Sequence, residues 1–103
     1  MKRALVALSI GLSCVSGTAL ASAELAKAKN CLACHASDKK VVGPSYQEVA
    51  AKYSKDKDAQ GKLAKKIREG GVGAWGQIPM PANPQVSEAE AQTLAKWVLT
   101  GAK

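Results

Sequence analysis

Apolar residues recur every three or four positions along three segments of the chain, which is the spacing of one face of an α-helix. These segments cover residues 45–53, 58–69 and 87–100, and a shorter stretch over residues 24–30 is a fourth helix candidate. No segment alternates between apolar and polar residues as a half-buried strand does. The pattern therefore predicts one all-α domain with about four short helices.

The last predicted helix has the clearest boundaries. Ser87 and Glu90 have the spacing of a capping box, in which each side chain bonds the other residue's backbone N–H. Val86 and Ala91 can form the hydrophobic contact that often accompanies such a box. Gly101 is the expected end of this helix, because glycine commonly follows a helix C-terminus.

The segment between the last two helices is rich in glycine and proline. Gly70 and Gly71 are expected to end the helix over residues 58–69. Residues 70–85 are then predicted to form a long non-helical loop. A loop of this length in so small a domain is usually functional.

Residues 1–23 have the layout of a secretory signal peptide. Lys2 and Arg3 precede an apolar run over residues 4–12, and small residues at the end of the segment suit cleavage after Ala23. The apolar run is too short to span a bilayer as a helix, so no membrane span is expected.

A lipoprotein signal acylated at Cys14 is a weaker alternative, because Gly11 stands where such signals usually carry a larger aliphatic residue. We therefore predict a mature domain over residues 24–103 in an oxidising compartment. The chain has 15 basic and 8 acidic residues, and loss of Lys2 and Arg3 with the leader would leave a net charge of +5. That charge can attract an acidic partner.

The mature domain is poorly supplied with large apolar side chains. The sequence contains no Phe, and a chain of this size usually needs disulfides or a metal to support a small core. The predicted mature part keeps two cysteines, Cys31 and Cys34, which are too close in sequence to staple much of the chain. Another group is therefore expected to fill the centre of the domain.

Cys31, Cys34 and His35 form a Cys-x-x-Cys-His motif that contains the only histidine of the chain. A thioredoxin-like dithiol requires βαβ patterning, which is missing, although a plain disulfide remains possible on spacing alone. A structural zinc site needs about four ligands, and a Cys–His nucleophile seldom uses adjacent residues. The motif is typical of covalent c-type haem attachment, with Cys31 and Cys34 as thioether anchors and His35 as iron ligand.

A haem that only carries electrons needs a second axial ligand, commonly Met or His. No second histidine exists, and Met80 is the one methionine of the predicted mature domain. Pro79 and Pro81 flank Met80 and stiffen the backbone on both sides. We therefore predict that Met80 binds the iron opposite His35.

Four motifs in this order, "NCLACH", "VVGP", "WGQIPMP" and "LAKWVL", resemble those of the small bacterial class I cytochromes c of the c-551/c-552 type. The resemblance covers essentially all of residues 24–103. It implies a monomeric periplasmic one-electron carrier with one covalent haem c, shuttling electrons between respiratory donors and a terminal reductase or oxidase such as nitrite reductase. It implies no enzymatic activity. The alternatives are a haem peroxidase or gas-binding protein, and a disulfide redox module without haem.

The resemblance also implies roles for further haem-binding residues. Pro44 would accept a hydrogen bond from the outer N–H of His35 through its backbone carbonyl. Trp75 would donate its indole N–H to a haem propionate. Asn83 would bond near the Met80 sulfur. Lys66 stands where some relatives carry Arg, and it can supply charge to a propionate but not a two-pronged contact.

We expect redox partners to dock on an apolar patch near the haem edge. The residues expected there are Leu32, Ile78, Pro79, Pro81 and Ala82. Nearby lysines, such as Lys29 and Lys39, would steer an acidic partner. Nucleic acid is not an expected partner of an exported haem domain.

Overall fold

The computed structural model describes residues 18–103, with side chains from residue 21 onwards. The predicted leader over residues 1–23 therefore lies largely outside the described residues. No helix in the described part is long and apolar enough to cross a membrane. The elements along the chain are α1 (Thr18–Ala28), a 3₁₀ turn η1 (Cys31–Ala33), α2 (Tyr46–Lys52), α3 (Ala59–Glu69), β1 (Gly71–Gly73), β2 (Gly76–Met80) and α4 (Glu88–Leu99).

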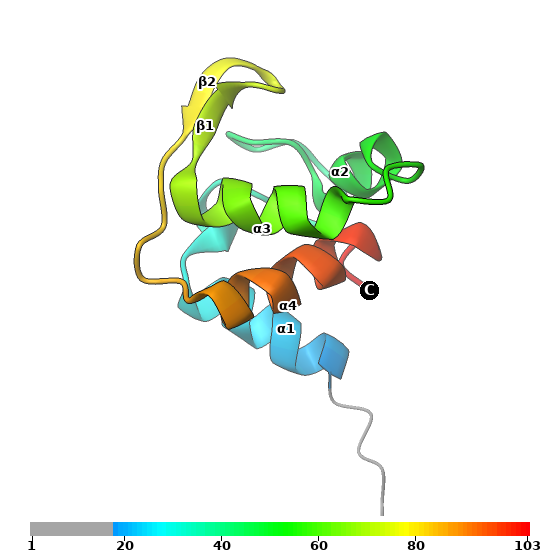
Figure 1. Cartoon of the computed structure of the whole chain (residues 1–103), viewed down its shortest axis with the longest axis vertical. Helices are drawn as coiled ribbons and strands as arrows, with labels where there is room; N and C mark the ends of the chain where they lie inside the picture. Colours follow the sequence, from blue (N-terminus) through cyan, green and yellow to red (C-terminus); the bar gives the residue numbers. More distant parts are fainter. Residues whose placement is uncertain (1–17) are drawn as a thin grey trace, which may run out of the picture.

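Helix α4 is the centre of the helical body. It packs against α3, α2 and α1, and α3 forms the most extensive of these contacts. Figure 1 shows α3 lying above α4, with α1 beneath α4 and α2 near the start of α3. The two strands rise from the end of α3 and arch away from the helices.

The four predicted helices are confirmed, and their boundaries have identifiable causes. The Ser87 side chain accepts from the Glu90 N–H at 3.1 Å, and the Ser87 N–H donates to the Glu90 carboxylate at 3.0 Å. An equivalent capping box joins Ser45 and Glu48 at the start of α2, although sequence analysis did not recognise it. Helix α1 begins earlier than predicted and ends at Ala28.

The expectation that the chain has no strand is wrong. Residues 70–85 are non-helical as predicted, but β1 and β2 within them pair as an antiparallel hairpin, with Gly73 opposite Gly76. The hairpin escaped detection because every residue of β1 is exposed and only Met80 of β2 is even half-buried. Strands without a buried face carry no alternating apolar pattern.

The helical core consists mainly of small side chains. Val86 and Leu94 are its largest fully buried residues, and alanines from α1, α3 and α4 fill much of the remainder. Two aromatic residues, Tyr46 and Trp97, join the same cluster and their ring centres lie 5.2 Å apart. The thin core expected from the composition is therefore observed.

Candidate functional site

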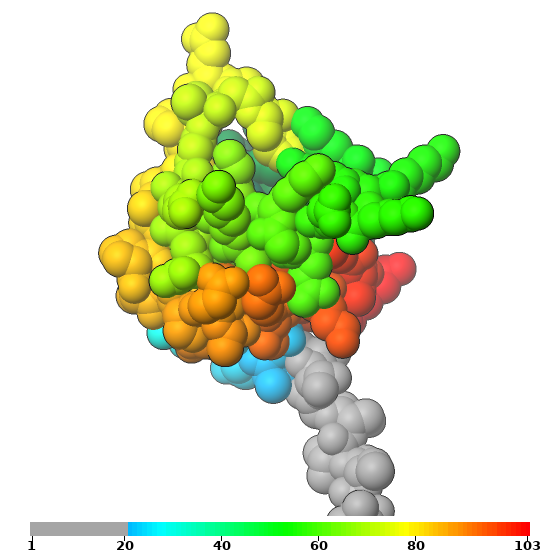
Figure 2. Space-filling model, viewed as in Figure 1, coloured from blue at the N-terminus to red at the C-terminus, as the bar shows by residue number. Residues whose placement is uncertain are grey.

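One cavity lies between the helical body and the hairpin. Figure 2 shows the molecule hollowed beneath the arch of the hairpin, above α3. Apolar side chains from α2, α3 and α4 form much of its lining, including Val49, Leu63 and Leu94. All eight residues that sequence analysis assigned to the haem site also line it: Cys31, Cys34, His35, Pro44, Lys66, Trp75, Met80 and Asn83.

The 3₁₀ turn η1 presents Cys31 and Cys34. Asn30, which precedes η1, has a left-handed backbone conformation with φ of 64°. This conformation changes the direction of the chain between α1 and η1. The N–H groups of Cys34 and His35 then both donate to the Cys31 carbonyl, at 3.2 and 3.1 Å. Cys31 and Cys34 form no disulfide with each other, and burial raises the pKa of the Cys31 thiol. A raised pKa disfavours the thiolate that a redox-active dithiol requires.

Three neighbours hold the His35 ring in place. Its Nδ1 lies 2.8 Å from the Pro44 carbonyl oxygen, which can only accept, so Nδ1 carries the proton and Nε2 is left to bind a metal. The Tyr46 ring stacks on His35 with ring centres 5.4 Å apart. Gly43 lies so close that a Cβ built there would be 2.5 Å from His35 Cε1.

Met80 ends β2 and is half-buried. Its backbone packs against Gly70, the residue that ends α3 and has φ of +71°. A Cβ on Gly70 would lie 2.7 Å from the Ala82 nitrogen and 2.8 Å from the Pro81 carbonyl carbon, and closer still to the Met80 carbonyl oxygen. The chain therefore brings a thioether to the same cavity as the imidazole, on a separate element.

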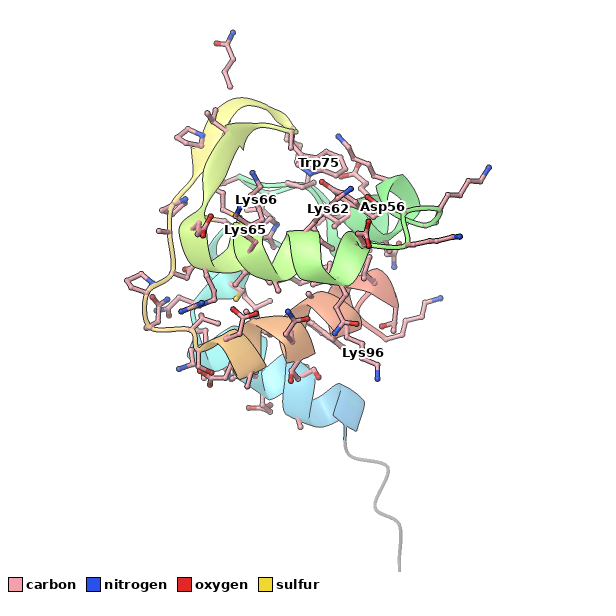
Figure 3. All side chains as sticks on the ribbon, in the orientation of Figure 1. Asp56, Lys62, Lys65, Lys66, Trp75 and Lys96 are labelled. Carbon is pink, nitrogen blue, oxygen red and sulfur yellow. The ribbon has the colours of Figure 1, made fainter. Side chains whose placement is uncertain are left out.

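Trp75 and Lys66 also border this cavity, from the hairpin and α3 respectively. Trp75 is 42 % exposed, and the Lys52 ammonium lies 4.5 Å from its ring centre. Figure 3 shows Lys66 between α3 and the hairpin, with Trp75 further along the arch towards α2. The cavity thus has basic and indole groups on the hairpin side.

Asn83 makes contacts that the sequence did not indicate. Its side-chain amide donates to the Ile67 carbonyl at 2.8 Å and lies 3.4 Å from the Pro81 carbonyl oxygen. Among the described residues it makes no hydrogen bond to the Met80 sulfur. In this structure Asn83 instead ties the chain after the hairpin to the end of α3.

Three neighbours of the site were not predicted as site residues. Tyr46 lies in the helix predicted over residues 45–53, but nothing in the sequence places its ring against His35. Lys52 ends the same helix, and its contact with the hairpin depends on the chain reversing over more than twenty residues. Gly43 carried a signal in the "VVGP" motif, since a glycine can mark close approach by another group.

The residues around the cavity fit a haem better than the alternatives. Two unpaired cysteines can attach the vinyl groups of a haem through thioether bonds. An imidazole with a free Nε2 and a methionine thioether can supply its two axial ligands. The described residues contain no group of three or more His, Cys, Asp or Glu side chains that could hold a metal ion, so the zinc alternative lacks its ligands. The apolar lining suits a porphyrin.

A four-helix domain with these donors around one apolar cavity defines a haem-binding protein of the c type. A comparison with protein-family models agrees, because the model described as cytochrome c matches residues 19–102. The chain belongs to the cytochrome c family. With its Cys-x-x-Cys-His motif, this membership implies one covalently bound haem c.

Two bacterial cytochromes c are informative relatives. The chain is 55 % identical to cytochrome c-552 of Nitrosomonas europaea over 86 residues, which cover 84 % of each chain. It is 62 % identical to cytochrome c-551 of Azotobacter vinelandii over 77 residues, covering 75 % of this chain and 93 % of the relative. The crystal structure of wild-type Nitrosomonas europaea cytochrome c552 superimposes with a TM-score of 0.74, covering 76 % of this chain and 96 % of that one.

These similarities confirm the predicted subgroup. The protein is a small class I cytochrome c of the c-551/c-552 type, and it is an electron-transfer protein rather than an enzyme. The haem peroxidase alternative is therefore not supported.

Proposed function

We propose that this cytochrome is a periplasmic one-electron carrier in which His35 and Met80 are the two axial ligands of the haem iron. The observation that carries the proposal is that the imidazole and the thioether line the same cavity from separate elements. When bound, the haem supplies an iron that accepts and releases a single electron. Cys31 and Cys34 would hold it covalently, and the ring of His35 is held by Pro44 and Tyr46.

The chemistry of Met80 favours a carrier. A thioether is a soft ligand that favours Fe(II) and raises the potential relative to two nitrogen ligands. It would also occupy the position that an oxygen-activating or gas-binding site leaves open. The single histidine of the chain would be the other ligand, so no distal histidine would remain for acid–base chemistry.

The Met80→Ala holoprotein tests the ligand assignment. The weak near-infrared sulfur-to-iron charge-transfer band should disappear, the potential should fall, and carbon monoxide should bind the reduced protein. Ile78→Ala is a matched control, because Ile78 lies in the same strand and also lines the cavity but has no ligand atom. Survival of the band in Met80→Ala would mean that another group is the ligand.

We also propose that respiratory partners, including a terminal reductase or oxidase, dock on the apolar patch of Leu32, Ile78, Pro79 and Pro81. Ile78 supports this best, because it lines the cavity and is nevertheless 63 % exposed. Leu32 is 47 % exposed and lies in η1 between the two cysteines. An exposed apolar patch rimmed by polar groups marks an interaction site.

The steering lysines need one revision. Lys29 donates to the Gln85 carbonyl at 3.0 Å and lies 3.5 Å from the Glu90 carboxylate, so it is already partnered. Lys39 is exposed and has no ion pair or hydrogen bond in the part of the chain that the structure describes. Lys39 is therefore the better candidate for steering an acidic partner.

The docking proposal is tested by the bimolecular transfer rate with a periplasmic partner at several salt concentrations. Ile78→Ser and Leu32→Ser should slow transfer, and Lys39→Glu should slow it most at low salt. Lys96→Glu makes the same charge change on α4, away from the hairpin (Figure 3), and should have little effect. Equal rates for both apolar variants and the parent, with unchanged spectra, would move the docking face elsewhere.

Export of the domain remains part of the proposal. Helix α1 runs through the proposed cleavage site after Ala23, and both Ala23 and Leu25 pack against the core. Removal of residues 1–23 would therefore shorten α1 to its last turn and a half. The intact mass of the protein from the periplasmic fraction should correspond to residues 24–103 plus one haem. A mass that retains residues 1–23 would contradict this proposal.

A further inference from the structure

The hairpin has few direct ties to the helical body. Of its residues, 71–80, only Met80 is even half-buried. Within the part of the chain that the structure describes, a single hydrogen bond joins residues 71–80 to any residue outside the hairpin. Its donor is Lys52 Nζ and its acceptor is the Ala74 carbonyl oxygen, at 2.7 Å. The attachment of the hairpin tip therefore depends on one side chain.

Lys52 is well placed to act as an anchor. It is the last residue of α2, which is fixed at its start by the Ser45–Glu48 capping box and packs against α4. The Lys52 ammonium makes a second contact with the hairpin, 4.5 Å from the ring centre of Trp75. A cation above an aromatic face is attracted by the ring electrons. One charged group thus binds both residues that connect β1 and β2.

We propose that Lys52 is a positioning residue that holds the hairpin closed over the cavity, and so controls how often Trp75 and Met80 leave it. The two residues lie on one short hairpin, so a tip that swings away takes the Met80 end of β2 with it. Figure 3 shows Trp75 on the arch above α3, which is the part of the hairpin that such a contact would hold. The effect on Met80 as a ligand rests on the function proposed above, whereas the effect on the hairpin itself does not.

Three variants of the haem-loaded protein test the proposal. Lys52→Met keeps the aliphatic stem but removes both contacts, and Lys52→Arg keeps a cation that can donate to Ala74 and stack on Trp75. Lys96→Met is the matched control, because Lys96 is also an exposed lysine near the end of a helix but lies on α4, away from the hairpin (Figure 3). Lys52 is exposed, so none of these changes disturbs the core.

The first measurement is amide hydrogen exchange of residues 72–78 by NMR. We expect about tenfold faster exchange in Lys52→Met, which corresponds to a free energy of hairpin opening that is lower by ~1.4 kcal/mol. Lys52→Arg and Lys96→Met should exchange nearly as slowly as the parent protein. The second measurement is imidazole binding to the oxidised protein. Its apparent affinity should rise by a similar factor, because affinity scales with the population of the binding-competent open state.

Hairpin exchange within twofold of the parent in Lys52→Met would overturn the proposal. An equal increase of the exchange rate in Lys96→Met would also overturn it, because loss of net charge alone would then explain the result. The two proposals fail separately. A parent protein without the near-infrared sulfur band would refute Met80 as ligand, while the exchange rates would still decide the role of Lys52.

Discussion

The substitution Gly70→Ala should damage this protein far more than its size suggests. Gly70 ends α3 with φ of 71° and ψ of −165°, a combination essentially restricted to glycine. The same position leaves no room for a side chain, since the nearest atoms to an added Cβ are backbone atoms of residues 80–82. Those atoms belong to a segment held by two prolines, Pro79 and Pro81, and cannot rotate away as a flexible side chain can.

The magnitude follows from these two effects. A non-glycine residue in such a conformation costs about 1–3 kcal/mol. Forcing the overlapping backbone apart costs roughly another 1–3 kcal/mol, as overpacking does in a core. We therefore expect Gly70→Ala to lower the free energy of unfolding by about 3 kcal/mol or more. For a domain of this size, that corresponds to a melting temperature lower by about 12–24 °C.

Gly61 offers a matched control with the opposite sign. It lies inside α3, and a Cβ added there has no neighbour within 4 Å. Gly61→Ala should therefore stabilise the protein by about 1 kcal/mol through helix propensity alone. Both variants should be measured as haem-loaded proteins by guanidinium unfolding, followed by far-ultraviolet circular dichroism.

The result has a second, independent readout. A Cβ at position 70 would push against the backbone of Met80. Gly70→Ala should therefore also weaken the near-infrared sulfur-to-iron band, while Gly61→Ala should leave it unchanged. If Gly70→Ala is as stable as the parent and keeps its spectrum, then the close contact between the end of α3 and the Met80 segment has been wrongly described.

Four further predictions concern the stability of the fold. Asn30→Ala should destabilise the protein by about 1–2 kcal/mol, whereas Asn30→Gly should cost little, because φ is 64° there; equal losses would refute this explanation. Ser87→Ala should cost about 1 kcal/mol by removing the helix cap, and no loss would mean that the cap is dispensable. The pKa of Glu90 is lowered below its usual 4.5, chiefly by its hydrogen bond from the Ser87 backbone N–H. The stabilisation that ionised Glu90 provides should therefore be complete above pH 4.5 and should be lost as the pH falls through the lowered pKa. Glu90→Gln should then make the free energy of unfolding less dependent on pH in the acid range. Replacing both Cys31 and Cys34 by Ala should leave a largely unfolded chain by circular dichroism, because a domain this small without Phe buries too little surface alone; a helical, cooperatively melting protein would contradict it.

Local signals in the sequence account for much of the helical fold. The capping box at Ser87, the apolar stripe through Leu94 and the glycine after Glu69 each act over a few residues, so the last two helices could be located without knowledge of their neighbours. The α2 box at Ser45 carried the same signal as the one at Ser87. It was overlooked rather than hidden.

The parts that could not be predicted depend on contacts between distant segments. The hairpin has no buried face, so its strands have no periodicity that a sequence could display. The Tyr46 ring on His35 and the Lys52 ammonium on Trp75 each require the positions of two elements at once. The bond of Asn83 to Ile67 could not be predicted for the same reason, since its amide reaches the Ile67 carbonyl only after α3 and the returning chain have packed together.

The contact of Tyr46 with both His35 and Trp97 has a consequence for how this sequence can change over evolutionary time. The Tyr46 ring stacks on the proposed iron ligand and makes a tilted contact with the buried Trp97 of α4. Closely packed interiors transmit strain, so a change of shape at Trp97 would tilt Tyr46 and alter the support of the imidazole. Natural selection would then act on substitutions in the middle of α4 through their effect on the iron ligand as well as through their effect on folding. Fewer kinds of residue should therefore be accepted at Trp97 than at other buried positions of this helix, such as Ala91, that lie outside this aromatic contact.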